Sequence, residues 1–156
     1  MINLTWPEYM GMIDVLDQKL LDYFEPVGKE IIYIAGIPRG GMFAALLLTY
    51  RSDRYEIVDP DRFDLRGQRL MAIIDDVLET GKTRSHWQES FAHMTPAPLF
   101  AVLIDKSPCY PGQAPAGIAV RTMTEKEWVC MPYENSQLEL EAEKGAYVQT
   151  IVAPQS

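Results

Sequence analysis

The residues best suited to chemistry lie between Leu70 and Thr83. A short apolar run there ends in two adjacent carboxylates, Asp75 and Asp76, and Glu79 precedes the turn Thr80-Gly81-Lys82-Thr83. Backbone N–H groups at a helix start bind anions, hydroxyl side chains add donors, and glycine lets the backbone approach closely. Carboxylates at the carboxyl end of a strand could bind ribose hydroxyls or Mg²⁺ beside that phosphate. The segment therefore predicts a site for a phosphorylated sugar.

The spacing of this segment excludes two other phosphate-binding motifs. The run Thr80 to Thr83 ends like a Walker A loop, but that motif needs a glycine five positions before Gly81, where Asp76 stands. The dinucleotide fingerprint G-x-G-x-x-G does not occur in the chain. An acidic helix cap followed by an incidental loop is the alternative to a phosphate site.

A second glycine-rich turn, Gly36-Ile37-Pro38-Arg39-Gly40-Gly41, also follows an apolar run and precedes a run rich in alanine and leucine. Arginine offers several donors in fixed geometry to phosphate oxygens, and the N–H groups of Gly40 and Gly41 would lie at the positive end of a helix. Alone, such a turn is also typical of a plain connection. Two such turns on consecutive strand–helix units favour one ligand with several phosphate groups.

The elements that position these turns alternate along the chain. After a helix from Trp6 to Phe24 with the capping box Thr5-Trp6-Pro7-Glu8, the pattern predicts strands at 30–35, 55–58, 70–74 and 99–104 and helices at 42–50 and 81–94. Residues 107–116 read as a loop, 117–120 and 128–131 as short strands, and the tail from Glu134 is left unassigned. Alternation of strands and helices predicts an α/β fold with a central, mostly parallel sheet flanked by helices.

Composition limits the classes of protein. The 156 residues, 47% hydrophobic and 23% charged, predict a single domain over 1–156 with ordinary soluble character. A formal net charge of -8 argues against non-specific binding to nucleic acid or to an anionic membrane. Cys109 and Cys130 form no C-x-x-C pair, and neither a membrane span nor an export signal is visible. These observations predict a cytoplasmic protein.

The run from Leu70 to Thr83 resembles the 5-phosphoribosyl-1-pyrophosphate (PRPP) signature of the type I phosphoribosyltransferases, and Gly36 to Gly41 resembles the pyrophosphate loop of the same family, in which the corresponding peptide can be cis. The resemblance implies that Asp75 and Asp76 face the ribose hydroxyls and the associated Mg²⁺, with Asp76 as the metal ligand. It implies a PRPP site made of Arg39, Gly40, Asp75, Asp76, Glu79, Thr80, Gly81, Lys82 and Thr83.

The last third of the chain resembles the 6-oxopurine branch of that family, and more closely its short xanthine-guanine members. Lys106 follows the strand predicted at 99–104, and Trp128 and Val129 come about twenty residues later. The resemblance implies a small base-binding hood: Lys106 donates to the purine 6-oxygen, Trp128 stacks on the ring, and the backbone of Trp128 and Val129 bonds the pyrimidine edge. The alternatives are a core or interface aromatic for Trp128 and a solvated strand end for Lys106.

The activity implied is Mg²⁺-dependent transfer of the 5-phosphoribosyl group from PRPP to guanine, xanthine or hypoxanthine, giving a nucleoside 5′-monophosphate and pyrophosphate. Glu79 would be the general base near the purine N7, although the family has an aspartate there, and residues 59–68 are short where many relatives carry a long catalytic lid. The family is usually dimeric or tetrameric, which implies a homo-oligomer. Two alternatives stay open: a pyrimidine or modified base as acceptor, and a PRPP- or nucleotide-binding regulator without turnover.

Overall fold

The computed structural model describes residues 1–28, 30–59 and 69–134. Two compact units make up the chain, and each is described by itself. The sheet unit is Gly11–Lys126, and the terminal unit is Met1–Met10 with Glu127–Ser156. Residues 60–68 and the tail from 135 lie outside the described residues, so most of the predicted loop at 59–68 does as well. The single domain over 1–156 stays a prediction.

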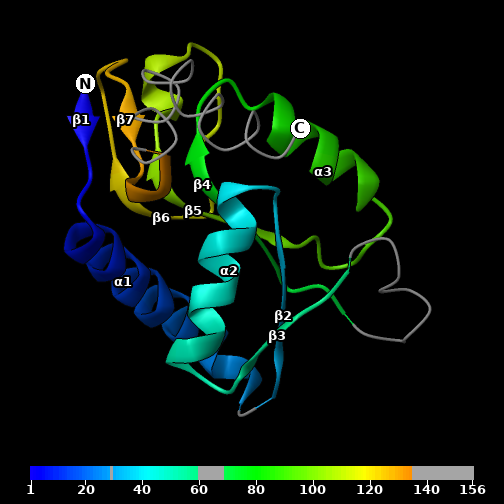
Figure 1. Cartoon of the computed structure of the whole chain (residues 1–156). Coiled ribbons are helices and arrows are strands. Elements are labelled where there is room, and N and C mark those ends of the chain that lie inside the picture. Colours follow the sequence, from blue (N-terminus) through cyan, green and yellow to red (C-terminus); the bar gives the residue numbers. More distant parts are fainter. Residues whose placement is uncertain (29, 60–68, 135–156) are drawn as a thin grey trace, which may run out of the picture. The chain divides into compact units, whose positions relative to one another are not determined.

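The sheet unit contains a five-stranded parallel sheet in the order β3-β2-β4-β5-β6 (Figure 1). Its strands are β2 Ile32–Gly36, β3 Tyr55–Ile57, β4 Ala72–Leu78, β5 Leu99–Asp105 and β6 Ile118–Thr122. Its helices are α2 Gly40–Arg51, α3 Lys82–Ser90 and the greater part of α1 Trp6–Phe24, with short 3-10 helices at Glu25–Val27 and Ser107–Cys109. The predicted α/β class with a parallel sheet and flanking helices is confirmed.

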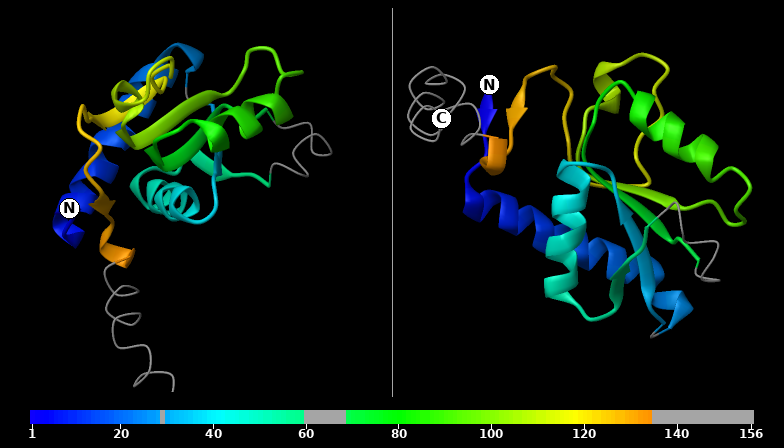
Figure 2. Two further views of the ribbon diagram at one scale, coloured as in Figure 1. Left: turned by 90° about the horizontal axis from the view of Figure 1, so that it is seen from above. Right: turned by 45° about the vertical axis from the view of Figure 1, so that its right-hand side comes forward.

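The order of the strands reverses between β2 and β4. From β2 the chain passes through α2 to β3 on one side, and then returns to β4 and passes through α3 to β5 on the other side (Figures 1 and 2). Right-handed crossovers in opposite directions place α2 and α3 on opposite faces of the sheet. Open α/β sheets bind ligands at such a switch point, beyond the carboxyl ends of the strands.

The sheet is buried on both faces, as its continuous apolar runs require. One face of the sheet packs against Trp87 of α3 and against Phe91, the residue that follows α3. The buried strand residues on this face are Ala35, Ile73, Phe100 and Val102. The intervening residues point to the other face and are buried too: Ile34, Ile74, Ala101 and Leu103. Helix α2 contacts β2, β3 and β4, and its buried residues include Ala44, Ala45 and Leu48.

Several predicted boundaries are wrong by two residues or more; among them, the helix predicted at 42–50 begins at Gly40 and the strand predicted at 117–120 ends at Thr122. The strand predicted at 70–74 is Ala72–Leu78, because its pairing with β5 continues as far as Leu78 opposite Asp105. Asp75 is therefore the middle residue of the strand and Asp76 follows it, so neither lies after the strand's end. The strand predicted at 30–35 begins at Ile32, and the helix predicted at 81–94 ends at Ser90. After Ser90 the α-helical hydrogen bonds give way to bonds between residues three apart, such as the one from the Met94 N–H to the Phe91 carbonyl.

The terminal unit has a two-stranded parallel sheet, β1 Ile2–Asn3 with β7 Val129–Cys130. Sequence patterns do not find β1, because two residues carry no periodicity. The capping box is confirmed: the Thr5 N–H donates to Glu8 Oε2 at 2.7 Å, and the Glu8 N–H donates to Thr5 Oγ1 at 3.3 Å. Edge-to-face contacts join the ring of Tyr9 to those of Trp6 and Tyr133.

Among the helices in the described part of the chain, none combines the length and the apolar character that crossing a membrane would require.

Candidate functional site

The turn predicted to bind phosphate connects β4 to α3. Gly81 has a φ of +79°, a left-handed conformation that favours glycine, and its carbonyl accepts the Ser85 N–H at 2.9 Å as α3 begins. Thr80, Lys82 and Thr83 are exposed. Within the described residues, the N–H groups of Thr80 and Gly81 donate to no acceptor. The turn therefore offers free backbone donors at a helix N-terminus, which is what an anion needs.

The second turn connects β2 to α2 and is held by its backbone. The Ile37 N–H donates to the Ile74 carbonyl at 2.9 Å, which ties the turn to β4. The peptide bond between Pro38 and Arg39 is cis, as the resemblance led us to expect. Arg39 is exposed, and α2 begins at Gly40. The first-turn N–H groups of α2 thus lie beside an arginine at the carboxyl end of β2.

Close packing of glycine brings the first turn against β4, the strand that leads into the second turn. A Cβ on Gly41 would overlap the carbonyl oxygen of Ile74 and would lie 3.0 Å from the Asp75 Cα. A Cβ on Gly36 would lie 2.5 Å from the Met42 Cα. The start of α2 therefore touches the backbone of β4 beside the acidic pair. In Figure 1 both turns lie at the upper edge of the sheet.

The two aspartates differ in environment. Asp75 is 9% exposed, and Asp76 is half-buried. Burial, and then the charge of Asp76, raise the pKa of Asp75 to about 8. The Asp76 N–H donates to Asp75 Oδ1 at 2.9 Å, and the Val77 N–H donates to Asp76 Oδ1 at 2.8 Å. At neutral pH Asp75 is therefore largely protonated, and the less buried Asp76 is the better placed of the two to contact a cation.

The predicted base-binding lysine and the predicted general base meet. Lys106 Nζ donates to Glu79 Oε1 at 2.9 Å, with the Lys106 side chain 3% exposed and the Glu79 side chain 39% exposed. The Lys106 N–H also donates to the Leu78 carbonyl at 2.8 Å. The solvated strand end that was the alternative for Lys106 is thus wrong. A charged donor and a carboxylate stand together at the ends of neighbouring strands β5 and β4.

Three polar residues of this region were missed by sequence reasoning. Asp105 is buried, and its two oxygens accept the N–H groups of Ser107 at 2.7 Å and Ala116 at 2.9 Å, so it closes the loop after β5. Arg84 is 7% exposed. Gln113 contacts both Arg84 and the Thr80 carbonyl. One signal could have found Arg84: with Trp87 and Phe91 it has the i, i+3, i+7 spacing of a buried helix face.

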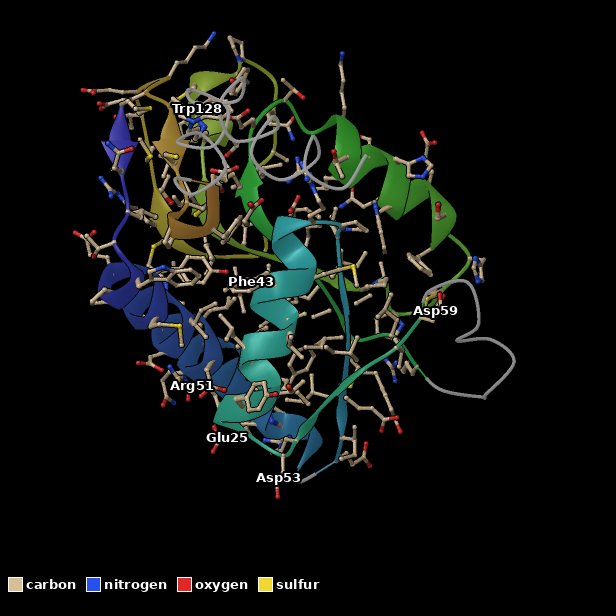
Figure 3. The ribbon with its side chains drawn as sticks, viewed as in Figure 1. Glu25, Phe43, Arg51, Asp53, Asp59 and Trp128 are labelled. Carbon is tan, nitrogen blue, oxygen red and sulfur yellow. The ribbon has the colours of Figure 1, made fainter. Side chains whose placement is uncertain are left out.

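Trp128 and Val129 belong to the terminal unit. Trp128 is 56% exposed and directly precedes β7 (Figure 3), so the alternative of a core side chain is wrong within this unit. Its carbonyl accepts the Ile2 N–H at 2.8 Å. Since backbone groups alternate in direction along a strand, the N–H and carbonyl of Val129 point away from β1. The part of both residues in base binding stays a prediction.

The donor set fits a magnesium ion that is shared with a substrate. No group of three or more His, Cys, Asp or Glu side chains suited to a metal occurs among residues 1–28, 30–59 and 69–134. Mg²⁺ is commonly bound through one or two carboxylates together with substrate phosphates and water. Asp76 could supply such a carboxylate.

Comparison with known proteins gives matches in structure alone. No family model matches the sequence, and no curated protein matches it. A purine phosphoribosyltransferase from Pyrococcus horikoshii is 22% identical with a TM-score of 0.63, and the match covers 85% of this chain and 92% of that one. The xanthine-guanine-hypoxanthine phosphoribosyltransferase of Helicobacter pylori is 13% identical with a TM-score of 0.65, over 90% and 98% of the two chains.

A third structure, a Neisseria gonorrhoeae protein solved with bound ppGpp, is 20% identical with a TM-score of 0.65, over 85% of this chain and 88% of that one. These likenesses concern the fold alone. The chain therefore has the fold of the type I phosphoribosyltransferases.

Proposed function

We propose that this protein is a Mg²⁺-dependent phosphoribosyltransferase that transfers the 5-phosphoribosyl group of PRPP to a 6-oxopurine. The observation that carries the proposal is the position of the two glycine-rich turns at the carboxyl ends of the neighbouring strands β2 and β4, at the switch point, where Gly41 packs on the backbone at Ile74 and Asp75. One ligand that spans both turns needs an anionic group at each end. PRPP has a 5-phosphate at one end and a diphosphate at the other.

Different residues would bind the different parts of PRPP. The N–H groups and hydroxyls of Thr80 to Thr83 would hold the 5-phosphate, and Arg39 with the start of α2 would hold the diphosphate. Asp75, protonated at neutral pH, can donate to a ribose oxygen, whereas Asp76 can accept from a ribose hydroxyl or bind Mg²⁺. Asp76 would hold Mg²⁺ beside the diphosphate, where the ion would supply neutralisation of negative charge.

The acceptor is inferred from Lys106 and Glu79. A lysine ammonium donates to a purine 6-oxygen and repels the 6-amino group of adenine, which favours guanine, xanthine or hypoxanthine. Glu79 would accept the proton carried by the purine N7 while the other imidazole nitrogen attacks the anomeric carbon. A bound base must compete for Lys106 Nζ, which now donates to Glu79. The base-stacking role of Trp128 belongs to the same proposal.

The direct test incubates the protein with PRPP, Mg²⁺ and a panel of nucleobases and follows released pyrophosphate. We expect turnover with at least one 6-oxopurine, none with adenine, and loss of turnover in EDTA. Turnover with a pyrimidine or a modified base alone would change the acceptor. Unchanged selectivity among purines in Trp128→Ala would favour the same alternative. No turnover with any base would defeat the proposal.

A regulator that binds nucleotides without turnover is the second candidate. The bound ppGpp in the Neisseria gonorrhoeae structure favours it, since that protein shares this fold. Calorimetry separates the two candidates: micromolar binding of PRPP or ppGpp without product from any base would favour the regulator. A homo-oligomeric state and a cytoplasmic location stay part of the proposal, and light scattering of the purified protein tests the first of them.

A further inference from the structure

We propose that Gln113 and Arg84 are positioning residues that fix the orientation of the peptide between Thr80 and Gly81. This inference rests on the proposed function, because it assigns to that peptide the N–H group that meets the 5-phosphate. The two side chains do not touch the donor themselves. They act through the turn that does.

The first observation is the hydrogen bond of Gln113 to the turn. The amide, oriented as its surroundings require, donates from nitrogen to the Thr80 carbonyl at 3.0 Å and accepts from Arg84 Nη2 through its oxygen. A Cβ on Gly81 would overlap the Gln113 side chain. Gln113 therefore lies against one side of the Thr80–Gly81 peptide.

Peptide geometry turns this contact into an orientation. The Thr80–Gly81 peptide is trans, so the Thr80 carbonyl and the Gly81 N–H point in opposite directions. Holding the carbonyl on the Gln113 side directs the Gly81 N–H to the other side, where it has no acceptor among the described residues. A peptide next to a glycine is easily flipped, because glycine tolerates both signs of φ. A flipped peptide would present a carbonyl oxygen to the phosphate and repel it.

The second observation is the burial of Arg84. Its guanidinium donates from Nη1 to the Pro115 carbonyl at 2.9 Å, from Nη2 to Gln113, and lies 5.9 Å from the centre of the Phe100 ring. Within the described ranges no carboxylate pairs with it. Buried arginine is costly unless its donors are used, and here they hold the segment from Gln113 to Pro115 against α3.

The loop that carries Gln113 is itself anchored. Asp105 accepts the N–H groups of Ser107 and Ala116, one near each end of the loop, and Arg84 adds a third attachment at Pro115. Gln113 is therefore presented from a supported backbone rather than from a free loop. This support lets a single amide impose one orientation on the peptide.

The test compares Gln113→Glu, Gln113→Leu and Arg84→Lys with the wild type, and uses Arg121→Met on the exposed part of β6 as the matched control. Glutamate keeps the shape and can still accept from Arg84, but it cannot donate to the Thr80 carbonyl. Steady-state kinetics with PRPP and the preferred base give KM and kcat, calorimetry gives the Kd of PRPP, and urea unfolding monitors the fold.

We expect KM and Kd for PRPP to rise about tenfold in both Gln113 variants, with the KM for the base within twofold and unfolding midpoints close to the wild type. A tenfold change corresponds to about 1.4 kcal/mol, the size of one hydrogen bond. Arg84→Lys should raise both constants less, and Arg121→Met should change neither. A purely structural role would lower the active fraction and kcat while leaving the KM for PRPP unchanged.

Gln113 variants that bind PRPP within twofold of the wild type would overturn the inference while leaving the proposed function intact. If the wild type neither binds nor turns over PRPP, the proposed function fails first and the inference falls with it. Should Arg84→Lys fail to fold, the two Gln113 variants decide alone.

Discussion

The two glycine-rich turns occupy the same edge of the sheet but are held by different interactions. The turn from Gly36 to Gly41 is held by backbone: the Ile37 N–H bonds the Ile74 carbonyl, and Gly41 touches the main chain of β4. The turn from Thr80 to Thr83 is held by the side chain of Gln113 and, behind it, Arg84. The first should tolerate no added atom, whereas the second should respond to substitutions about thirty residues away.

The largest effect on stability is expected for Gly41→Ala. Its new methyl group would overlap the Ile74 carbonyl, which belongs to a central strand and cannot move aside. We expect the free energy of unfolding in urea to fall by about 3 kcal/mol. Gly11→Ala is the matched control, because nothing lies within 4 Å of its Cβ and alanine favours the helix. If Gly41→Ala lowered the free energy of unfolding by less than Gly81→Ala does, the two turns would not differ in the way that we infer.

Gly81→Ala should cost less, about 1–2 kcal/mol, because the φ of +79° is strained for alanine but the overlapping atoms belong to a side chain that can rotate. PRPP binding should weaken more than this stability loss implies, since Gln113 would be displaced. Comparing Gly81→Ala with the double variant Gly81→Ala/Gln113→Ala in urea sharpens the point. If the double variant is no more stable than Gly81→Ala, the overlap between the new methyl group and Gln113 contributes nothing to the loss of stability.

Asp75→Asn should alter the dependence of stability on pH, measured in metal-free buffer. The fold raises the pKa of Asp75 from 3.8 to about 8, so the folded state favours the neutral carboxyl. The contribution of this carboxyl group to the free energy of unfolding is fully present below pH 3.8 and is lost as the pH rises through about 8. At pH 9 we expect the free energy of unfolding of the asparagine variant to exceed that of the wild type by at least about 1 kcal/mol, and at pH 4 we expect the two values to be equal. Parallel profiles for the two proteins would contradict this.

Glu79→Gln should change stability least, by about 1 kcal/mol or less, because the amide oxygen still accepts from Lys106 and the position is partly exposed. Activity should respond very differently, with kcat lower by about 100-fold if Glu79 is the general base. Pyrophosphate release and urea unfolding measured on the same preparation separate the two effects. A kcat near that of the wild type would remove Glu79 from the mechanism.

Much of the fold could be predicted from the sequence, because local patterns determine it. Apolar runs followed by glycine and hydroxyl residues mark where parallel strands end and helices begin, and these ends share one edge of the sheet. These local patterns fail where the pairing of a strand with its neighbour decides how far the strand extends. Strand β4 continues through Asp75 and Asp76 to Leu78 because β5 offers partners over that length, although acidic residues disfavour strands.

The sequence by itself determined the class of fold, the two turns and the chemistry of their donors, since backbone N–H groups at a helix start and an adjacent arginine follow from residue types a few positions apart. Only the tertiary structure decided that Lys106 pairs with Glu79, that Arg84 and Gln113 support the turn at Thr80, and that Asp75 is largely neutral at pH 7. The reason is physical: pairing and desolvation depend on which distant segments the sheet brings together, and spacing along the chain carries no measure of that distance.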